Sequence, residues 1–278
     1  MGKRLFSILC MLALLLSVRG SASAQERVDV SPLEVYFFDA GKADAILLTT
    51  QSGAILLDCG RKGFGQTILD ELSARGIKAL DYLIITHFDK DHVGGAAKVI
   101  NNFPVKAVLQ SNSPKASEEY AKYIKALNNA NLEAVTVREE CEFTLDGITF
   151  TVNPPRKSNY INDDSNNSSL IVTVVNGDDI LLFLGDAQTE RLEEYLEDGS
   201  VDCDFLKVAH HGGEEPLIDV LIASVRPELA VITCSEDEPE SDAILQSLEK
   251  SGTALWLTRV APVSVTSNGE CVTVAYEG

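Results

Sequence analysis

Four potential metal ligands fall within six residues of this sequence, inside the segment from Thr86 to Gly95. They are His87, Asp89, Asp91 and His92. The apolar run 81–85 before them has the composition of a buried strand, and residues 96–100 after them are typical of a helix. In an extended segment alternate side chains share a face, so this spacing is expected to place His87, Asp89 and Asp91 together. Gly94 and Gly95, at the end of this segment, have no side chains and so allow another part of the backbone to approach closely.

The chain has only four histidines, and the other two are the adjacent pair His210-His211. This pair follows a second strand-like run, 204–209, so every histidine comes after the end of a predicted strand. Such a distribution is a poor match for incidental surface loops. Imidazoles combined with carboxylates suit divalent ions such as Zn²⁺ or Mn²⁺.

An approximate internal repeat organises the chain between these clusters. Residues 45–50 and 54–58 are predicted to form a hairpin, followed by a helix at 66–74 and a strand at 82–85. Residues 169–175 and 180–184, the helix 189–196 and the strand 205–209 repeat this order. Each unit therefore ends at a pair of histidines.

These segments resemble the metallo-β-lactamase superfamily, and within it the branch containing the hydrolase domain of the competence protein ComEC and the related phosphorylcholine esterases. The resemblance runs from about Val35 to the C-terminus. The segments that carry it are 38–45, 57–60, 87–95, 184–187 and 206–212. It implies an α+β fold, an αββα four-layer sandwich in which the two repeat units form the two halves.

The resemblance also implies two divalent ions, Zn²⁺ or Mn²⁺, bridged by Asp186. Site one is expected to use His87, Asp89 and Asp186. Site two is expected to use Asp91, His92, Asp186 and one histidine of the pair, for which we favour His211. For Asp186 the alternative is a helix N-cap, because helix-forming residues follow it.

Catalysis is predicted to involve His210, placed beside the substrate, and Asp91. Bound metal lowers the pKa of water towards neutrality, so a metal-bound hydroxide is the expected nucleophile. The acidic neighbours Glu214 and Glu215 are expected to favour the protonated form of whichever histidine stays free of metal. Asp58 and Asp39 are expected to orient ligands or loops.

Several positions depart from the family pattern. Asp89 stands where the antibiotic-degrading relatives have histidine, although the ComEC branch shares this aspartate. Gly213 replaces a serine of the branch, and residues 235–239 replace a later asparagine and histidine. These differences leave three functions open: phosphodiester hydrolysis, which we favour, amide or ester hydrolysis of the β-lactamase or lactonase type, and metal binding at a surface without catalysis.

Residues 1–24 have the basic start, apolar core and small-residue cleavage site of a signal peptide, which leaves 25–278 as the hydrolase domain. We therefore expect a secreted or extracytoplasmic protein without stable membrane insertion after cleavage. Cleavage leaves 20 basic and 42 acidic residues, a net charge of −22. No cluster of Lys and Arg is visible in the sequence, so nucleic acid is possible but disfavoured, and a small-molecule or cell-envelope phosphodiester is the preferred substrate.

Overall fold

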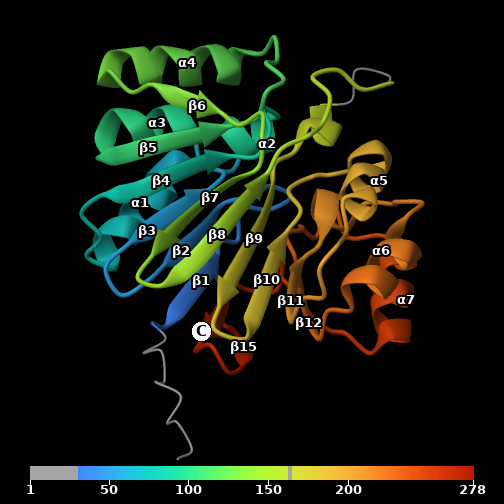
Figure 1. Cartoon of the computed structure of the whole chain (residues 1–278). Helices are drawn as coiled ribbons and strands as arrows, with labels where there is room; N and C mark the ends of the chain where they lie inside the picture. Colours follow the sequence, from blue (N-terminus) through green and yellow to red (C-terminus); the bar gives the residue numbers. More distant parts are fainter. Residues whose placement is uncertain (1–30, 162–164) are drawn as a thin grey trace, which may run out of the picture.

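Two β-sheets pack face to face, and helices cover both outer faces (Figure 1). The structure is a computed structural model and describes residues 31–161 and 165–278. The predicted signal peptide, 1–24, lies outside the described residues. The observed layers confirm the αββα four-layer sandwich.

The first sheet has eight strands in the order β15-β14-β1-β2-β3-β4-β5-β6. Their bounds are β1 Leu33–Phe37, β2 Ile46–Thr49, β3 Ala54–Leu57, β4 Leu80–Ile85, β5 Val105–Gln110, β6 Ala134–Thr136, β14 Val263–Ser267 and β15 Val272–Tyr276. Three helices pack on its outer face: α1 Gly65–Ala74, α3 Ala96–Asn102 and α4 Glu118–Ala130. A fourth, α2 Lys90–Val93, is a single turn after β4.

The second sheet has seven strands in the order β13-β12-β11-β10-β9-β8-β7. Their bounds are β7 Cys141–Leu145, β8 Ile148–Asn153, β9 Ile171–Asn176, β10 Asp179–Phe183, β11 Phe205–Lys207, β12 Leu229–Ile232 and β13 Ala254–Leu257. Its outer helices are α5 Thr189–Glu197, α6 Ile218–Val225 and α7 Asp242–Ser251, and 3-10 turns lie at Ser165–Ser168 (η2) and Ala209–Gly212 (η3).

Strand β2 shows why these sequences fold into layers. Ile46 and Leu48 point into the core between the sheets, whereas Leu47 packs against the outer helices. Both faces of the strand are buried, so the strand reads as a continuous apolar run rather than an alternating one. Aromatic rings fill the core between the sheets, with ring centroids 6.2 Å apart for Phe37 and Phe183 and 5.7 Å for Phe37 and Phe205.

The internal repeat is confirmed, with one unit in each sheet. The hairpin β2–β3 is followed by α1 and by β4 parallel to β3, and the hairpin β9–β10 is followed by α5 and by β11 parallel to β10. The backbone N–H of Leu170, just before β9, donates to the carbonyl of Thr86, just after β4, at 2.9 Å. This contact brings the two strand ends, and therefore their histidines, to one edge of the sandwich.

The expected extended spacing of ligands holds only as far as Asp89. Helix α2 begins at Lys90, and Asp89 occupies its N-cap position with extended backbone angles. Asp91 and His92 therefore project from a helical turn, not from the alternating face of a strand. The prediction of one extended segment was wrong because the chain turns into a helix two residues earlier than the spacing suggested.

Gly94 and Gly95 are required by close contact with the turn after β3. A Cβ on Gly95 would lie 2.3 Å from the carbonyl oxygen of Cys59, and one on Gly94 would lie 2.4 Å from the backbone nitrogen of Lys62. Neither contact is sterically possible without a shift of backbone. The predicted role of the two glycines in close backbone approach is confirmed, and the contact fixes the ligand segment against residues 59–62.

We expect Gly95→Ala to lower the free energy of unfolding by about 1–3 kcal/mol, the usual cost of overpacking a rigid site. Urea denaturation of both proteins measures it. Gly252→Ala is a useful comparison, because Gly252 has a φ of 80° and nothing within 4 Å of its added Cβ. Its cost comes from backbone strain alone, so a smaller loss for Gly95→Ala than for Gly252→Ala would contradict the steric explanation.

Candidate metal centre

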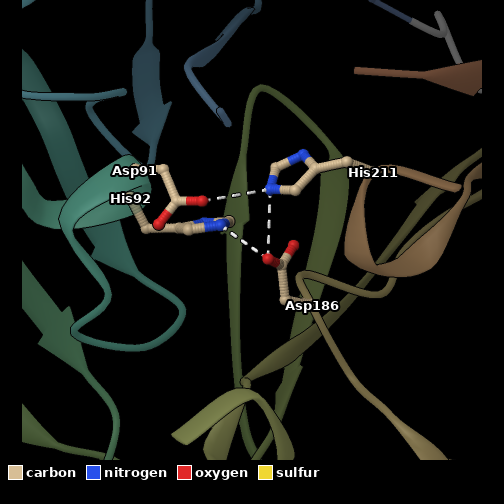
Figure 2. A group of neighbouring side chains, drawn as sticks. All are labelled: Asp91, His92, Asp186 and His211. Carbon is tan, nitrogen blue, oxygen red and sulfur yellow. Dashed lines mark hydrogen bonds and ion pairs between the residues drawn. The ribbon is translucent and has the colours of Figure 1, made fainter. Parts of the chain in front are cut away.

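Four side chains from three parts of the chain converge at this edge of the sandwich (Figure 2). They are Asp91, His92, Asp186 and His211, and each offers a ligand atom within 4.8 Å of the others. His92 Nε2 lies 2.9 Å and His211 Nε2 3.1 Å from Asp186 Oδ2. His211 Nε2 lies 3.6 Å from Asp91 Oδ2. These are the residues predicted for site two, and the fold brings them together, while their role as ligands stays a prediction.

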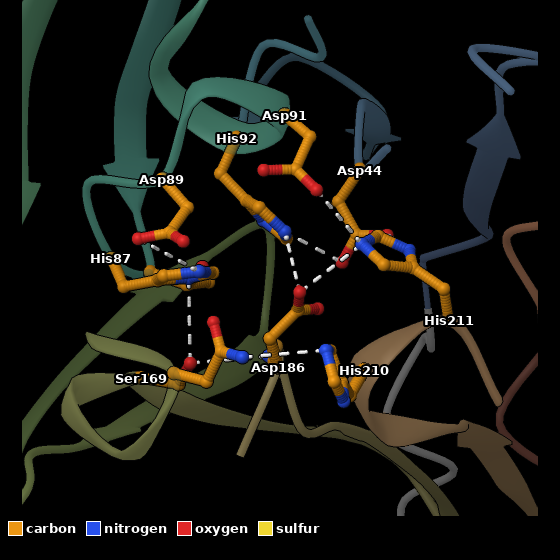
Figure 3. Close-up of polar contacts among 12 residues, drawn as sticks. Asp44, His87, Asp89, Asp91, His92, Ser169, Asp186, His210 and His211 are labelled. Carbon is orange, nitrogen blue, oxygen red and sulfur yellow. Dashed lines mark hydrogen bonds and ion pairs between the residues drawn. The ribbon is translucent and has the colours of Figure 1, made fainter. Parts of the chain in front are cut away.

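The residues predicted for site one lie beside this group but are less tightly gathered (Figure 3). The ring centroids of His87 and His92 are 4.1 Å apart, and His87 Nε2 is 3.9 Å from Asp89 Oδ1. Lys115 Nζ donates to the same Asp89 oxygen at 2.6 Å, and the hydroxyl of Ser165 donates to it as well. One oxygen of Asp89 is thus already held by two protein donors.

Asp186 does not cap a helix. Helix α5 begins at Thr189, and its N-cap residue is Gln188, without a side-chain capping bond. The backbone N–H of Asp186 donates to Ser169 Oγ at 3.1 Å, which turns the carboxylate towards His92 and His211. The helix-cap alternative was wrong, and the role of Asp186 as a shared ligand stays a prediction.

The two adjacent histidines occupy different environments. His211 is fully buried in the cluster, whereas His210 is half-buried and lines the pocket above it. Both have left-handed backbone angles, with φ of 49° and 54°. Two consecutive residues with side chains in this region are strained, and such strain is typical of functional sites. The two ring centroids lie 6.3 Å apart.

Burial lowers the pKa of His210, so the expected protonated form is not favoured in the free protein. The prediction from Glu214 and Glu215 was wrong because the Glu215 carboxylate is turned elsewhere. It accepts bonds from the hydroxyl of Thr189 and the backbone N–H of Leu217.

The buried rings of His87, His92 and His211 are each oriented by a hydrogen bond that the Nδ1 atom donates. His92 Nδ1 donates to Asp58 Oδ2 at 2.7 Å. The hydroxyl of Thr86 donates to Asp58 Oδ2 at 2.6 Å, so its oxygen is left to accept from His87 Nδ1 at 3.2 Å. A hydroxyl has one proton to give, and this decides the direction of the second bond. In both rings Nε2 is the atom directed at the cluster.

His211 is held by a matching relay. The Thr233 hydroxyl donates to Asp44 Oδ1 at 2.6 Å and therefore accepts from His211 Nδ1 at 3.0 Å. The other Asp44 oxygen accepts from Lys207 Nζ, which also donates to the carbonyl of Gly185 at 3.0 Å. Burial would raise the pKa of Asp44, but the Lys207 charge lowers it below its usual value, so the relay ends in an ion pair.

Buried nitrogen and oxygen atoms without hydrogen bonds indicate whether this cluster could hold a cation. His87 Nε2, His211 Nε2 and Asp186 Oδ1 are buried and make no hydrogen bond within the described residues. Only ion-pair contacts reach two of them: carboxylates lie near His211 Nε2, and Lys207 Nζ lies 3.7 Å from Asp186 Oδ1. Such atoms cost free energy unless something else satisfies them. Burial, together with the neighbouring His92, lowers the pKa of His87 to about 4, so this ring is neutral and its Nε2 carries a lone pair. Imidazole nitrogen and carboxylate oxygen are suitable ligands for Zn²⁺ or Mn²⁺.

The electrostatic field of the cluster also favours a cation. Burial would lower the pKa of His92 and His211, but the Asp186 carboxylate raises both. Burial would raise the pKa of Asp186 and Asp91, but the two histidines hold both below their usual values. The site therefore attracts positive charge into the space between its rings and carboxylates. The predicted ligands fit a divalent metal.

Sequence reasoning missed most of the supporting residues. Asp44 and Lys207 lie inside motifs that carried the resemblance, but nothing in the sequence shows that they meet. Thr86, Thr233 and Lys115 carry no sequence signal of their role. Of the two predicted orienting residues, Asp58 holds His92, whereas Asp39 is exposed and accepts the backbone N–H of Gly41 at 3.3 Å, a contact within its own loop.

A family model described as the metallo-beta-lactamase superfamily matches residues 39–235. The chain belongs to this superfamily. Its members are generally metal-dependent hydrolases, and the match spans every predicted ligand from His87 to His211.

One relative is named a competence protein and another a ComE operon protein, which confirms the ComEC-like resemblance inferred from the motifs. ComE operon protein 3 of Bacillus subtilis (strain 168) is 27% identical over 252 residues, which cover 83% of this chain and 31% of that protein. Competence protein ComA of Neisseria gonorrhoeae is 29% identical over 209 residues, covering 74% and 28%. Recombination protein 2 of Haemophilus influenzae is 26% identical over 212 residues, covering 74% and 25%. The chain spans less than a third of the length of each.

Solved structures share the fold at low identity. The metallo-beta-lactamase fold protein YhfI from Bacillus subtilis aligns with a TM-score of 0.56 at 10% identity, covering 81% of this chain and 95% of that one. A variant of the CmlA beta-hydroxylase aligns with a TM-score of 0.56 at 14% identity, covering 85% and 53%. Since the second is named a hydroxylase, the fold alone does not decide the reaction. No helix in the described ranges combines the length and apolar character needed to cross a membrane.

We expect Thr233→Val to weaken divalent-metal binding about 10- to 100-fold, because it removes the oxygen that orients His211 and keeps the side-chain shape. Titration of the metal-free protein with Zn²⁺ or Mn²⁺ measures the affinity. Thr189→Val serves as the control, since its hydroxyl bonds Glu215 outside the cluster. Equal affinities in all three proteins would show that the relay does not act on the metal.

Proposed function

We propose that this chain is an exported, metal-dependent hydrolase that cleaves phosphodiesters, with two divalent ions, Zn²⁺ or Mn²⁺. The observation that best supports this proposal is the set of residues that line a pocket of about 470 Å³ above the cluster. Its floor includes Asp91 and Asp186, and His210 and Asn166 stand on one side. The rest of its lining comprises four basic residues and the acidic Asp89, Glu119 and Glu238.

Four cations line this pocket, and we call them the basic wall: Lys42, Arg61, Lys62 and Lys90. The whole chain carries a net charge of −19, so their presence in one pocket is unusual for its surface. Arg61 and Lys62 are adjacent, but Lys42 and Lys90 lie elsewhere in the sequence, so no larger basic cluster was visible there. A wall of positive charge beside a cation-binding floor suits an anionic substrate.

The proposed ligands divide between two positions. His87, Asp89 and Asp186 would hold one ion, and Asp91, His92, Asp186 and His211 the other. Divalent ions in such a site lower the pKa of water, polarise the substrate and neutralise charge as it develops. The chain's own contribution is orientation: Asp58 and Thr86 fix His92 and His87, and Thr233 fixes His211.

His210 is proposed to assist the leaving group. It lines the pocket, and its Nε2 lies 3.3 Å from the Asn166 amide nitrogen, which places that atom on the substrate side. A negatively charged phosphodiester beside the ring would favour its protonated form. The Asn166 amide nitrogen donates to Nε2 in the free protein. Once the substrate displaces that amide, the protonated Nε2 would donate to the leaving oxygen.

A hydrolysis assay distinguishes this proposal from the two alternatives, amide or ester hydrolysis and metal binding without catalysis. A neutral lactam or ester would gain little from the basic wall, and a binding protein without catalysis would not need a half-buried histidine above the ligands. Wild-type protein that binds metal but hydrolyses no phosphodiester, and instead opens a lactam or lactone, would favour the amide or ester hydrolase.

We expect His210→Ala to retain its metal and to lose about 10²–10⁴-fold in kcat, the usual contribution of a general acid or base. His211→Ala should lose both metal and activity, because His211 is buried in the cluster. The assay follows hydrolysis of bis-p-nitrophenyl phosphate with Mn²⁺ or Zn²⁺, together with elemental analysis. Metal loss in His210→Ala with full occupancy in His211→Ala would reverse the assignment.

We also propose that export removes residues 1–24. The expected product begins at Gln25, and the intact mass of the protein recovered outside the cytoplasm measures it. A full-length product that stays with the membrane would contradict this proposal.

A further inference from the structure

Arg61 differs from almost every other arginine that the structure describes. Five of them pair with carboxylates: Arg75, Arg156, Arg191, Arg226 and Arg259. Arg61 and Arg138 have no ion pair within the described ranges, although the chain contains 42 acidic residues. Of these two, only Arg61 lines the pocket above the candidate metal centre. Its guanidinium is therefore available to an anion there.

The backbone that carries Arg61 is fixed to the ligand segments. The N–H of Cys59 donates to the carbonyl of His92 at 2.7 Å, and the N–H of Gly60 donates to the carbonyl of Asp44 at 2.6 Å. Gly94 and Gly95 pack against this turn with no room for a side chain. Arg61 thus starts from a rigid position beside the cluster, although its side chain is exposed.

The side chain itself rests on a glycine. Guanidinium atoms of Arg61 lie 3.3 to 3.7 Å from the place that a Cβ would take on Gly41. Gly41 has a φ of 75°, a conformation that glycine adopts without strain. The flat guanidinium can therefore lie against the loop while its N–H groups face the pocket. A planar guanidinium binds phosphate through two parallel hydrogen bonds, which an ammonium cannot do.

The neighbouring lysines form only weak, exposed ion pairs. Lys42 and Lys62 lie 3.8 Å from Glu238 and Glu118, which are exposed. Exposed pairs of this kind contribute little free energy, so an anionic ligand can replace them. Lys90 has no ion pair within the described ranges and stands at the start of α2. The basic wall can therefore respond to a bound anion around Arg61.

We propose that Arg61 binds a second phosphate group of the substrate, next to the phosphodiester that is cleaved. The scissile group belongs over Asp91, Asp186 and His211, where bound ions would neutralise it. Arg61 lines the same pocket but makes no ion pair with these carboxylates within the described ranges, so we assign it to a different anion. The site then prefers a diester that carries a neighbouring phosphate. This inference rests on the proposed function for its substrate, but the binding measurement below does not.

Two matched pairs of probes test the proposal on the metal-loaded protein. One pair is the p-nitrophenyl ester of thymidine 5′-phosphate, with and without a 3′-phosphate, followed by release of nitrophenol. The other pair is thymidine 3′,5′-bisphosphate and thymidine 5′-phosphate, followed by calorimetric binding. Each pair differs by one phosphate group only.

We expect Arg61→Gln to raise KM for the ester with the 3′-phosphate about 10- to 100-fold, the usual effect of losing charge-assisted hydrogen bonds. The ester without it should lose much less, because Lys42, Lys62 and Lys90 of the basic wall remain, and the loss should fall on KM rather than on kcat. The bisphosphate should lose its binding advantage over the monophosphate. Arg61→Lys should restore part of that advantage, and the control Arg138→Gln, with the same change of charge outside the pocket, should leave it unchanged.

Equal losses for both members of a pair would overturn the proposal, since Arg61 would then act on the scissile group or on folding. No loss in Arg61→Gln, or equal wild-type binding of bisphosphate and monophosphate, would overturn it as well. If wild-type protein cleaves neither ester, the proposed function fails, and the binding pair still decides whether Arg61 recognises a second phosphate.

Discussion

The candidate metal centre depends on the hydrogen bonds of one buried carboxylate, that of Asp58. It accepts from the Thr86 backbone N–H at 2.8 Å, from the Thr86 hydroxyl at 2.6 Å and from His92 Nδ1 at 2.7 Å. It thereby orients His92 directly and His87 through Thr86. Asp58 itself has a φ of 57° at the end of β3, where the chain must turn. A single carboxylate links the first sheet, the ligand segment and the orientation of two rings.

The second half of the centre is oriented from the first half of the chain. Asp44 lies before β2, yet it holds Thr233, after β12, and Lys207, at the end of β11. Burying an aspartate and a lysine costs desolvation that their attraction must offset, so removing one partner alone would leave a buried charge unpaired. The pair therefore joins the two sheets at the edge where the ligands meet. The position of the two sheets relative to each other and the orientation of His211 therefore both depend on Asp44.

The sequence predicted the elements that local pattern controls. The hairpins 45–58 and 169–184 and the histidine clusters after the strands that follow were found from apolar runs, turn residues and the ligand spacing, and the family resemblance supplied the αββα arrangement. Contacts between distant residues were not predictable in this way. Lys207 and Asp44 are 163 positions apart, and no periodicity connects them. The left-handed angles of His210 and His211 were not predicted either. Although histidine is enriched in this region, any residue other than glycine is uncommon there, and two in succession leave no local signal.

Lys115 explains how an aspartate can stand at position 89, where the antibiotic-degrading relatives have histidine. A neutral imidazole brings a ligand atom without charge, whereas a carboxylate adds a negative charge to a cluster that already holds Asp91 and Asp186. Burial would raise the pKa of Asp89, but His87, Lys115 and Ser165 lower it, so the side chain is ionised. Lys115, 2.6 Å away, balances that charge and leaves the second carboxylate oxygen outside this contact. The Asp89–Lys115 pair is then equivalent in net charge to a neutral histidine. As a proposed ligand, Asp89 would change the ligand atom at site one from nitrogen to oxygen without changing the charge of the centre, and oxygen ligands shift the preference of a site towards harder ions such as Mn²⁺.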